Sequence, residues 1–127
     1  MNSADCRIFR ISADASLREQ RVLRKELFCS LRPGALPVIV DLSSLMGLNH
    51  DDIDLLLDCA ALASGRDVRL LLVAGSRPNR VLLEITRLSS VLPVFNLLAD
   101  ALDSIARAKT FPPENAFASD PARPRSA

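Results

Sequence analysis

The chain has 127 residues, of which 49% are apolar and 24% are charged, and its formal net charge is +1. This length and apolar content are enough for one globular domain with a hydrophobic core of its own. The near-neutral charge and the absence of Trp and Tyr argue against a nucleic-acid binder, which needs cations for the phosphates or aromatic rings for the bases.

The first part of the chain predicts a strand followed by a helix. Residues 6–11 (CRIFRI) have the mixed polarity typical of a short strand at the edge of a sheet. The segment 17–31 predicts a helix, which Pro33 and Gly34 bring to an end. The apolar residues that share one face of this helix are Leu23, Leu27, Phe28 and Leu31.

Two short apolar runs, 37–42 (PVIVDL) and 68–73 (VRLLLV), predict the central strands of the fold. Both are apolar at successive positions, which is typical of parallel strands that are covered on both faces. We therefore expect the two strands to be adjacent, parallel and buried.

The segment between these runs, NHDDIDLLLDCA at 49–60, predicts a helix with a strongly polar start. Asn49 or His50 can cap the helix. The two aspartates that follow then fall in the first turn, where carboxylates meet the positive end of the helix dipole. We expect the helix to end just before Gly65, which would act as a left-handed stop.

The last part of the domain predicts two more helices with a brief strand between them. The first helix covers 78–88. Its expected buried residues are Val81, Leu82, Ile85 and Leu88. A strand follows at 91–95, and Asn96 caps a last helix with an amphipathic stripe. The residues of this stripe are Leu97, Leu98, Ala101, Leu102, Ile105 and Ala108.

This alternation of strands and helices predicts an α/β fold with a mostly parallel central sheet of four to five strands, packed with about four helices. The folded domain is expected over residues 1–110. After Thr110 the composition shifts to FPPENAFASDPARPRSA. Its prolines and its few apolar residues predict a flexible C-terminal tail over 111–127.

The cysteines and the apolar runs indicate in which cellular compartment the protein is expected. Cys6, Cys29 and Cys59 have no C-x-x-C spacing, which predicts reduced thiols and, for Cys59, a small core side chain. The amino-terminal segment carries charges where a signal peptide needs an apolar stretch. No apolar run approaches the roughly 20 residues that cross a bilayer. We expect a cytoplasmic protein without membrane insertion.

Three segments of the chain, taken in order, are VIVDLSSL, GRDVRLLLVAGSRPNRVLLEITRLSSVLPVF and NLLADAL. Together they resemble the STAS domain, which is shared by sulfate transporters and anti-sigma-factor antagonists. VIVDLSSL resembles the family strand that ends in Asp-Leu-Ser. The stretch GRDVRLLLVAGSRPNRVLLEITRLSSVLPVF resembles a Gly-ended helix, a buried strand, and the helix that leads to a short strand. NLLADAL resembles the start of the last helix. The likeness covers residues 6–108 and lies in the order and spacing of the elements.

The resemblance implies a STAS-like fold and a role in protein–protein binding. Antagonists of this family bind an anti-sigma factor, often a serine kinase, which phosphorylates a serine in a D-S-x-G motif after the DLS strand. Counted from Asp41, the motif falls on Asn49, His50, Asp51 and Asp52. His50 occupies the serine position, so no phosphorylation is expected there. The connection RISADASL also leaves little room for the second strand with which family members usually begin.

Several kinds of surface or site are compatible with the acidic start of this helix. His50, Asp54 and Asp58 are spaced i, i+4, i+8, and a solvent-exposed polar face explains this spacing without any chemistry. A metal-dependent enzyme that uses His50 and the nearby carboxylates is an alternative, although one helix supplies two ligands at best. We expect no cofactor, no metal and no catalytic residue.

The function that we favour is an interaction module without catalysis. The expected partner-binding residues are Asn49, His50, Asp51, Asp52, Asp54 and Asp58. Their carboxylates favour a partner that presents Lys or Arg. The expected partner is an anti-sigma factor or a serine-kinase-like regulator, and not nucleic acid. The alternative is a STAS subunit that regulates the ATPase of an ABC-type lipid transporter.

Overall fold

The computed structural model describes residues 6–110, in which strands alternate with helices. In chain order the elements are β1 (Arg7–Arg10), α1 (Leu17–Ser30), β2 (Val38–Asp41), α2 (His50–Arg66), β3 (Leu70–Val73), α3 (Arg77–Ile85), α4 (Leu88–Val91), β4 (Val94–Phe95) and α5 (Leu98–Thr110). Residues 1–5 and the predicted tail, 111–127, lie outside the described range.

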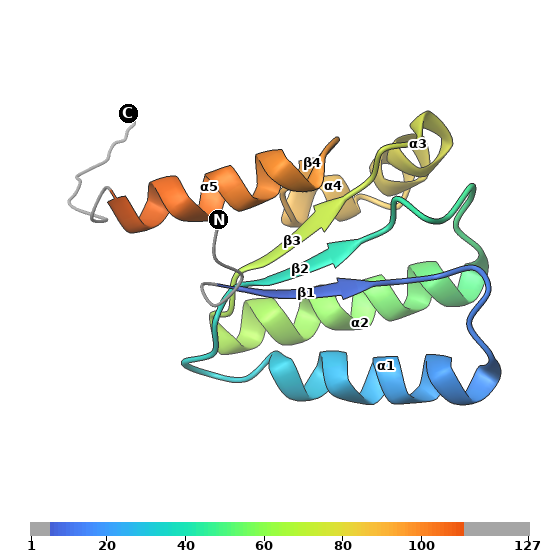
Figure 1. Cartoon of the computed structure of the whole chain (residues 1–127), viewed down its shortest axis with the longest axis horizontal. Helices are drawn as coiled ribbons and strands as arrows, with labels where there is room; N and C mark the ends of the chain where they lie inside the picture. Colours follow the sequence, from blue (N-terminus) through green and yellow to red (C-terminus); the bar gives the residue numbers. More distant parts are fainter. Residues whose placement is uncertain (1–5, 111–127) are drawn as a thin grey trace.

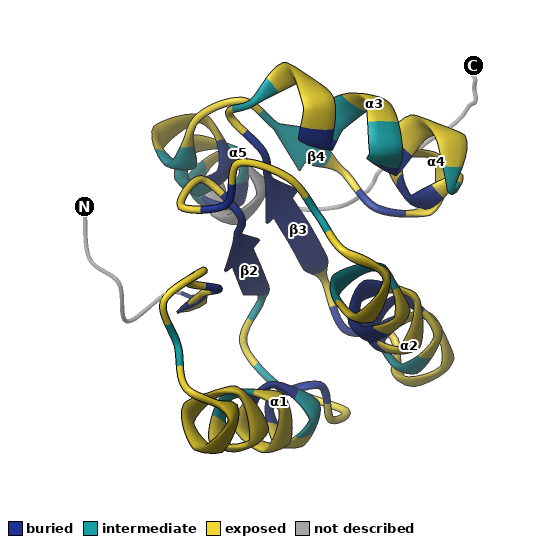
Figure 2. Ribbon diagram, turned by 90° about the vertical axis from the view of Figure 1, so that its right-hand side faces the viewer, coloured by how far each residue is buried: buried dark blue, intermediate teal, exposed yellow. Residues whose placement is uncertain are grey.

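The strands of this range form one parallel sheet in the order β1-β2-β3-β4. Every residue of β2 and β3 is buried, and Val40 lies in register with Leu72. The prediction of two adjacent, parallel and buried strands is confirmed, and so is the edge position of β1. Helices α1 and α2 cover one face of the sheet and α5 covers the other, while α3 and α4 lie near the β4 edge (Figures 1 and 2).

Burial from both sides explains why the central strands are apolar at successive positions. Alternate side chains point to opposite faces of the sheet. The set on the side of α1 and α2 includes Val38, Val40, Leu70 and Leu72, together with Leu27 and Leu56. The set on the side of α5 includes Ile39, Leu71 and Val73, together with Ala101 and Ile105.

Helix α1 confirms the first predicted helix, and it lies largely in solvent. It begins with a capping box, in which Ser16 Oγ accepts a hydrogen bond of 3.1 Å from the Glu19 backbone N–H and Glu19 Oε1 accepts one of 2.8 Å from the Ser16 N–H. Within α1, Leu27 and Ser30 alone are buried. The helix is therefore held to the domain along a narrow face.

The predicted stop of α2 at Gly65 is wrong, because the helix continues to Arg66. The left-handed residue is Asp67, with a φ of 56°. Asp tolerates this conformation better than most residues. The turn is closed by the Val68 backbone N–H, which donates a hydrogen bond of 3.0 Å to the Ala63 carbonyl.

The predicted helix over 78–88 is in fact two helices, α3 and α4. Arg87 separates them in the left-handed conformation, with a φ of 67°. The predicted inward face is also wrong, because Val81 and Ile85 are 41% and 70% exposed while Leu83 is fully buried. Asn79, one turn before Leu83, is also buried. The apolar residues alone therefore do not mark the buried face of α3.

The end of the domain agrees in part with the predictions. The strand predicted over 91–95 is only Val94–Phe95, and α5 begins at Leu98, so the predicted cap at Asn96 is wrong because Leu97 directly precedes the helix. Leu88 is buried and Leu82 is half-buried. Helix α5 packs on the sheet through Leu98, Ala101, Leu102 and Ile105. Leu97 precedes the helix and is 61% exposed, and the side chain of Ala108 lies outside the described part.

Candidate partner-binding surface

The first of the predicted site residues lie at the carboxyl end of the sheet, where parallel α/β folds present their binding loops, and Asp58 lies farther along α2. Strand β2 ends at Asp41, and the loop 42–49 leads from it to the start of α2. Asn79 of α3 holds this loop, because its buried Nδ2 donates a hydrogen bond of 3.0 Å to the Leu45 carbonyl. The start of α2 is therefore anchored to a second helix.

Asn49 and Asp52 form a capping box at the start of α2. Asn49 Oδ1 accepts a hydrogen bond of 2.8 Å from the Asp52 backbone N–H, and Asp52 Oδ2 accepts one of 3.1 Å from the Asn49 N–H. Of the two predicted caps, Asn49 is thus the one that the helix uses. Both side chains already serve to begin the helix, which leaves fewer acceptor positions for a partner.

The other predicted site residues point into solvent. His50, Asp51, Asp54 and Asp58 are all exposed. His50 Nδ1 lies 3.9 Å from Asp54 Oδ2, and the two side chains are 89% and 56% exposed. A pair at this distance and exposure contributes little to stability. The structure therefore brings His50 and Asp54 together and leaves both available to a partner.

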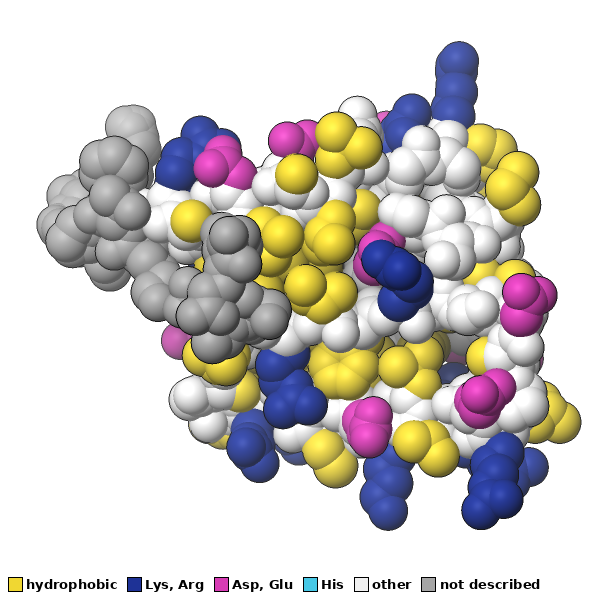
Figure 3. Space-filling view, viewed as in Figure 1, with side chains coloured by type: hydrophobic (Ala, Val, Ile, Leu, Met, Phe, Trp, Pro, Cys, Tyr) yellow, Lys and Arg dark blue, Asp and Glu magenta, His cyan; other side chains and the backbone are white. Residues whose placement is uncertain are grey.

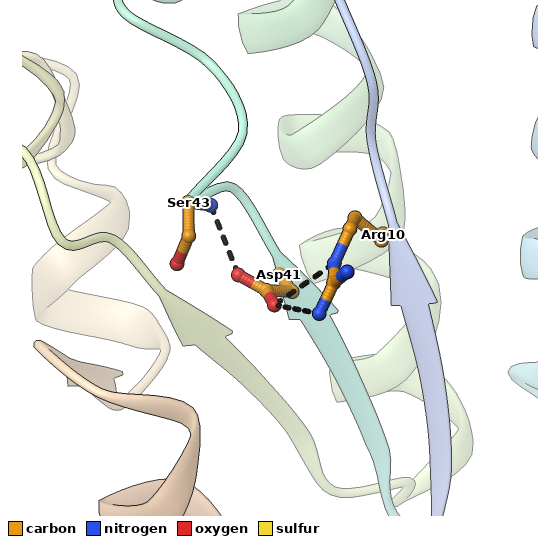
Figure 4. A network of polar contacts seen from close by, with 3 residues as sticks. All are labelled: Arg10, Asp41 and Ser43. Atoms are coloured by element: carbon orange, nitrogen blue, oxygen red, sulfur yellow. Dashed lines mark hydrogen bonds and ion pairs between the residues drawn. The ribbon is translucent and has the colours of Figure 1, made fainter.

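A buried carboxylate lies at the end of β2, where the loop to α2 begins (Figure 4). Asp41 is 2% exposed, and its Oδ1 accepts a hydrogen bond of 2.9 Å from the Ser43 backbone N–H. Its Oδ2 lies 3.3 Å from Arg10 Nη2 and accepts a hydrogen bond of 3.4 Å from Arg10 Nε. This network joins the edge strand to β2 and shapes the first turn of the loop. The sequence carries no signal for it, because the two paired residues are far apart in the chain.

A cleft of about 220 Å³ opens between α1, the β1–α1 connection and the start of α2. Gln20 and Arg24 of α1 line it from one side, and Asn49, Asp51 and Asp52 line it from the other. It is smaller than the roughly 300–1,000 Å³ pockets that enclose small-molecule ligands. This cleft was not predicted, since it depends on how two helices pack.

The Cys59 thiol of α2 is buried next to the acidic residues of the same helix. Burial raises the pKa of the Cys59 thiol to about 12, with the negative charge of Asp58 as the second cause. A neutral, buried thiol is a poor nucleophile, so Cys59 is a core side chain, as predicted. Among the described residues, no group of three or more His, Cys, Asp or Glu side chains is placed to hold a metal ion.

Comparison with known proteins bears on the fold. The sequence matches no protein-family model and no curated protein. Its structure is similar to the NMR structure of the protein TM1081, with a TM-score of 0.65 and 15% identity, over 81% of this chain and 83% of that chain. The crystal structure of the same Thermotoga maritima protein, a candidate anti-sigma factor antagonist, gives a TM-score of 0.61 and 13% identity over the same shares. The chain has a STAS-like fold.

The STAS-like fold confirms the resemblance that the sequence predicts. A mixed α/β chain with a four-stranded parallel sheet falls within the expected four to five strands. One strand, β1, precedes α1 in the described range, as the short RISADASL connection predicts. None of the described helices combines the length and the apolar character of a membrane span.

Proposed function

We propose that this chain is a non-catalytic interaction module that binds a regulatory protein through the start of α2. We call the binding region the α2 surface; it consists of Asn49, His50, Asp51, Asp52, Asp54 and Asp58. The observation that carries the proposal is that a firmly capped and anchored helix presents carboxylates to solvent at the carboxyl end of the sheet. The likeness to TM1081 supports a regulatory role of this kind.

The charge of the α2 surface defines the chemistry of the partner. Asp51, Asp54 and Asp58 are exposed, and the first basic residue of α2 is Arg66, in its last turn. A partner that places Lys or Arg opposite these carboxylates would gain in both association rate and specificity. Because such pairs are screened by salt, binding should weaken as the ionic strength rises.

The partner that we infer is an anti-sigma factor or a serine-kinase-like regulator, bound without a phosphorylation switch. His50 offers no hydroxyl at the position where the resemblance implies the phosphoserine. Asp51 and Asp52 already place negative charge in the first turn, although a carboxylate carries one charge and a phosphoserine about 1.5–2. Binding should therefore be insensitive to ATP.

Affinity capture from the native cell tests the proposal. The tagged protein should retain an anti-sigma-factor-type protein, and the Asp51→Lys/Asp54→Lys variant should lose it. The matched control is Glu84→Lys/Asp100→Lys, which changes the net charge equally at two exposed positions on other helices. Equal retention by both variants would contradict the proposed surface. Capture of an ABC ATPase would instead assign the chain to a transporter complex.

Intact-mass measurement after incubation with the captured partner and ATP tests the absence of the switch. The wild-type protein should gain no phosphate, and phosphate on residues 49–52 would contradict the proposal. The variant His50→Ser/Asp52→Gly rebuilds NSDG, which a kinase partner should phosphorylate. Because Asp52→Gly also removes half of the capping box, the single variant Asp52→Gly is the control for a loosened helix start.

A further inference from the structure

The exposed sides of α1 and α2 carry two charged stripes of opposite sign. The basic stripe of α1 consists of Arg18, Arg21 and Lys25. The acidic stripe of α2 consists of Asp51, Asp54 and Asp58. All six residues are exposed. Each set has the spacing i, i+3, i+7, which places its members along one side of a helix.

The two stripes lie at matching heights. Helices α1 and α2 are neighbours that run in the same direction under the sheet and begin at the same end of the molecule (Figures 1 and 2). Each stripe begins at the second residue of its helix, so its members are equally far from the start. Figure 3 shows Lys and Arg side chains projecting along the lower edge of the molecule, where α1 runs.

The stripes do not neutralise each other within one chain. The ion pairs of the described residues join Arg10 with Asp41, His50 with Asp54, and Arg107 with Asp103. None of these pairs includes the basic stripe, and the single pair that touches the acidic stripe is long and exposed. The six charged side chains thus form two rows with no ion pair between them, and Arg24 of α1 is the cation that shares a cleft with Asp51.

We propose that these stripes are a self-complementary surface through which the chain binds a second copy of itself. The basic stripe of each protomer would lie on the acidic stripe of the other. A two-fold axis parallel to the helices brings α1 opposite the partner's α2 twice, without changing the heights of the charges. A two-fold axis across the helices would bring α1 opposite the partner's α1, and the repulsion between like charges disfavours it.

The size of the surface predicts a weak, transient dimer. With 14 and 17 residues, the helices are about 21 and 25 Å long and about 10 Å wide each, which gives about 400–500 Å² per protomer. The total of about 900 Å² is below the roughly 1,200–2,000 Å² of stable interfaces. If the α2 surface binds a regulator as proposed above, the dimer and that complex would exclude each other, because both cover the acidic stripe.

Sedimentation velocity of the purified full-length protein tests the dimer without any knowledge of the regulator. Interference detection suits a chain without Trp or Tyr. The weight-average sedimentation coefficient should rise with protein concentration at about 0.05 M salt. The rise should disappear at about 1 M salt, where the Debye length falls to about 3 Å. A wild-type protein that stays monomeric at every concentration and both salt levels would overturn the proposal.

Charge reversal identifies the surface. The basic-reversed variant is Arg18→Glu/Arg21→Glu/Lys25→Glu. The acidic-reversed variant is Asp51→Lys/Asp54→Lys/Asp58→Lys. Each should dimerise at least about tenfold more weakly than the wild type. The control variant Glu84→Lys/Asp100→Lys should dimerise as strongly as the wild type.

An equimolar mixture of the two reversed variants should form a heterodimer, because opposite charges then face each other again in both contacts. A chain that carries all six reversals should dimerise with itself. Misfolded variants could not be rescued in this way. Dimerisation that survives either reversal, or reversed variants that stay monomeric when mixed, would refute the proposed geometry. If the wild type is monomeric under all conditions and the acidic-reversed variant no longer binds the regulator, the acidic stripe binds the regulator alone.

Discussion

Replacement of Asn49 by Ala should destabilise the start of α2, on which the geometry of the α2 surface depends. The substitution removes Oδ1, which accepts the 2.8 Å hydrogen bond from the Asp52 backbone N–H. Loss of such an N-cap acceptor costs about 0.5–2 kcal/mol. Because Asn49 is exposed, water can reach the N–H that is left, and we expect a loss of about 1 kcal/mol in the free energy of unfolding. For a domain of about 100 residues this lowers the Tm by about 4–8 °C.

Urea denaturation and thermal melts, both followed by far-ultraviolet circular dichroism, measure this loss. Asn49→Asp is the matched control, because it keeps an acceptor at the cap and should change the free energy of unfolding by less than about 0.5 kcal/mol. If Asn49→Ala is as stable as Asn49→Asp and the wild type, the capping box does not set the start of α2. The capping box would then not hold the geometry of the α2 surface.

Three further predictions concern the core and the buried ionisable groups. Val40→Asp should abolish the cooperative thermal melt, because an unpaired carboxylate at this fully buried position costs several kcal/mol of a total of about 5–15; a normal melt would contradict the assigned core. Arg10→Met should lower the free energy of unfolding in urea by about 1–2 kcal/mol, since it leaves the Asp41 carboxylate with its Ser43 hydrogen bond but without its cation. An unchanged urea midpoint would show that the pair of Arg10 and Asp41 does not contribute to stability. The pKa of Cys59 rises from 9.0 to about 12 on folding, so the stability tied to the neutral thiol is present below pH 9 and is lost as the pH rises toward 12. The Tm of the wild type should therefore fall as the pH becomes alkaline, and Cys59→Ala should reduce this fall. An equal fall in both proteins would contradict the raised pKa of Cys59.

The fold could be predicted from the sequence because its main signals are local. Runs that are apolar at successive positions mark strands covered on both faces, and β2 and β3 are such strands. The prediction failed where a tertiary contact overrides the local pattern. Asn79 takes a fully buried position to bond the Leu45 carbonyl, so α3 turns Val81 and Ile85 outward. The end of α2 was missed for a local reason, because Asp67 takes the left-handed conformation in place of Gly65 and the Val68 N–H closes the turn on the Ala63 carbonyl.

The exposed positions of the candidate site residues were also predictable, but their surroundings were not. Helical periodicity places His50 and Asp54 on one exposed face, and the capping preference of Asn marks the first turn. The cleft between α1 and α2 and the pairing of Arg10 with Asp41 arise from residues that are distant in the chain. No local pattern encodes such contacts, so they appear only once the helices are packed on the sheet.

The most direct test of the proposed function is the Kd of the captured regulator for the wild-type protein and for the Asp51→Lys/Asp54→Lys variant, measured by titration calorimetry. If the α2 surface receives a basic face of the regulator, the variant should bind at least about tenfold more weakly, a difference of about 1.4 kcal/mol. The Glu84→Lys/Asp100→Lys control should bind like the wild type. Equal Kd values for the wild type and the Asp51→Lys/Asp54→Lys variant would contradict the account.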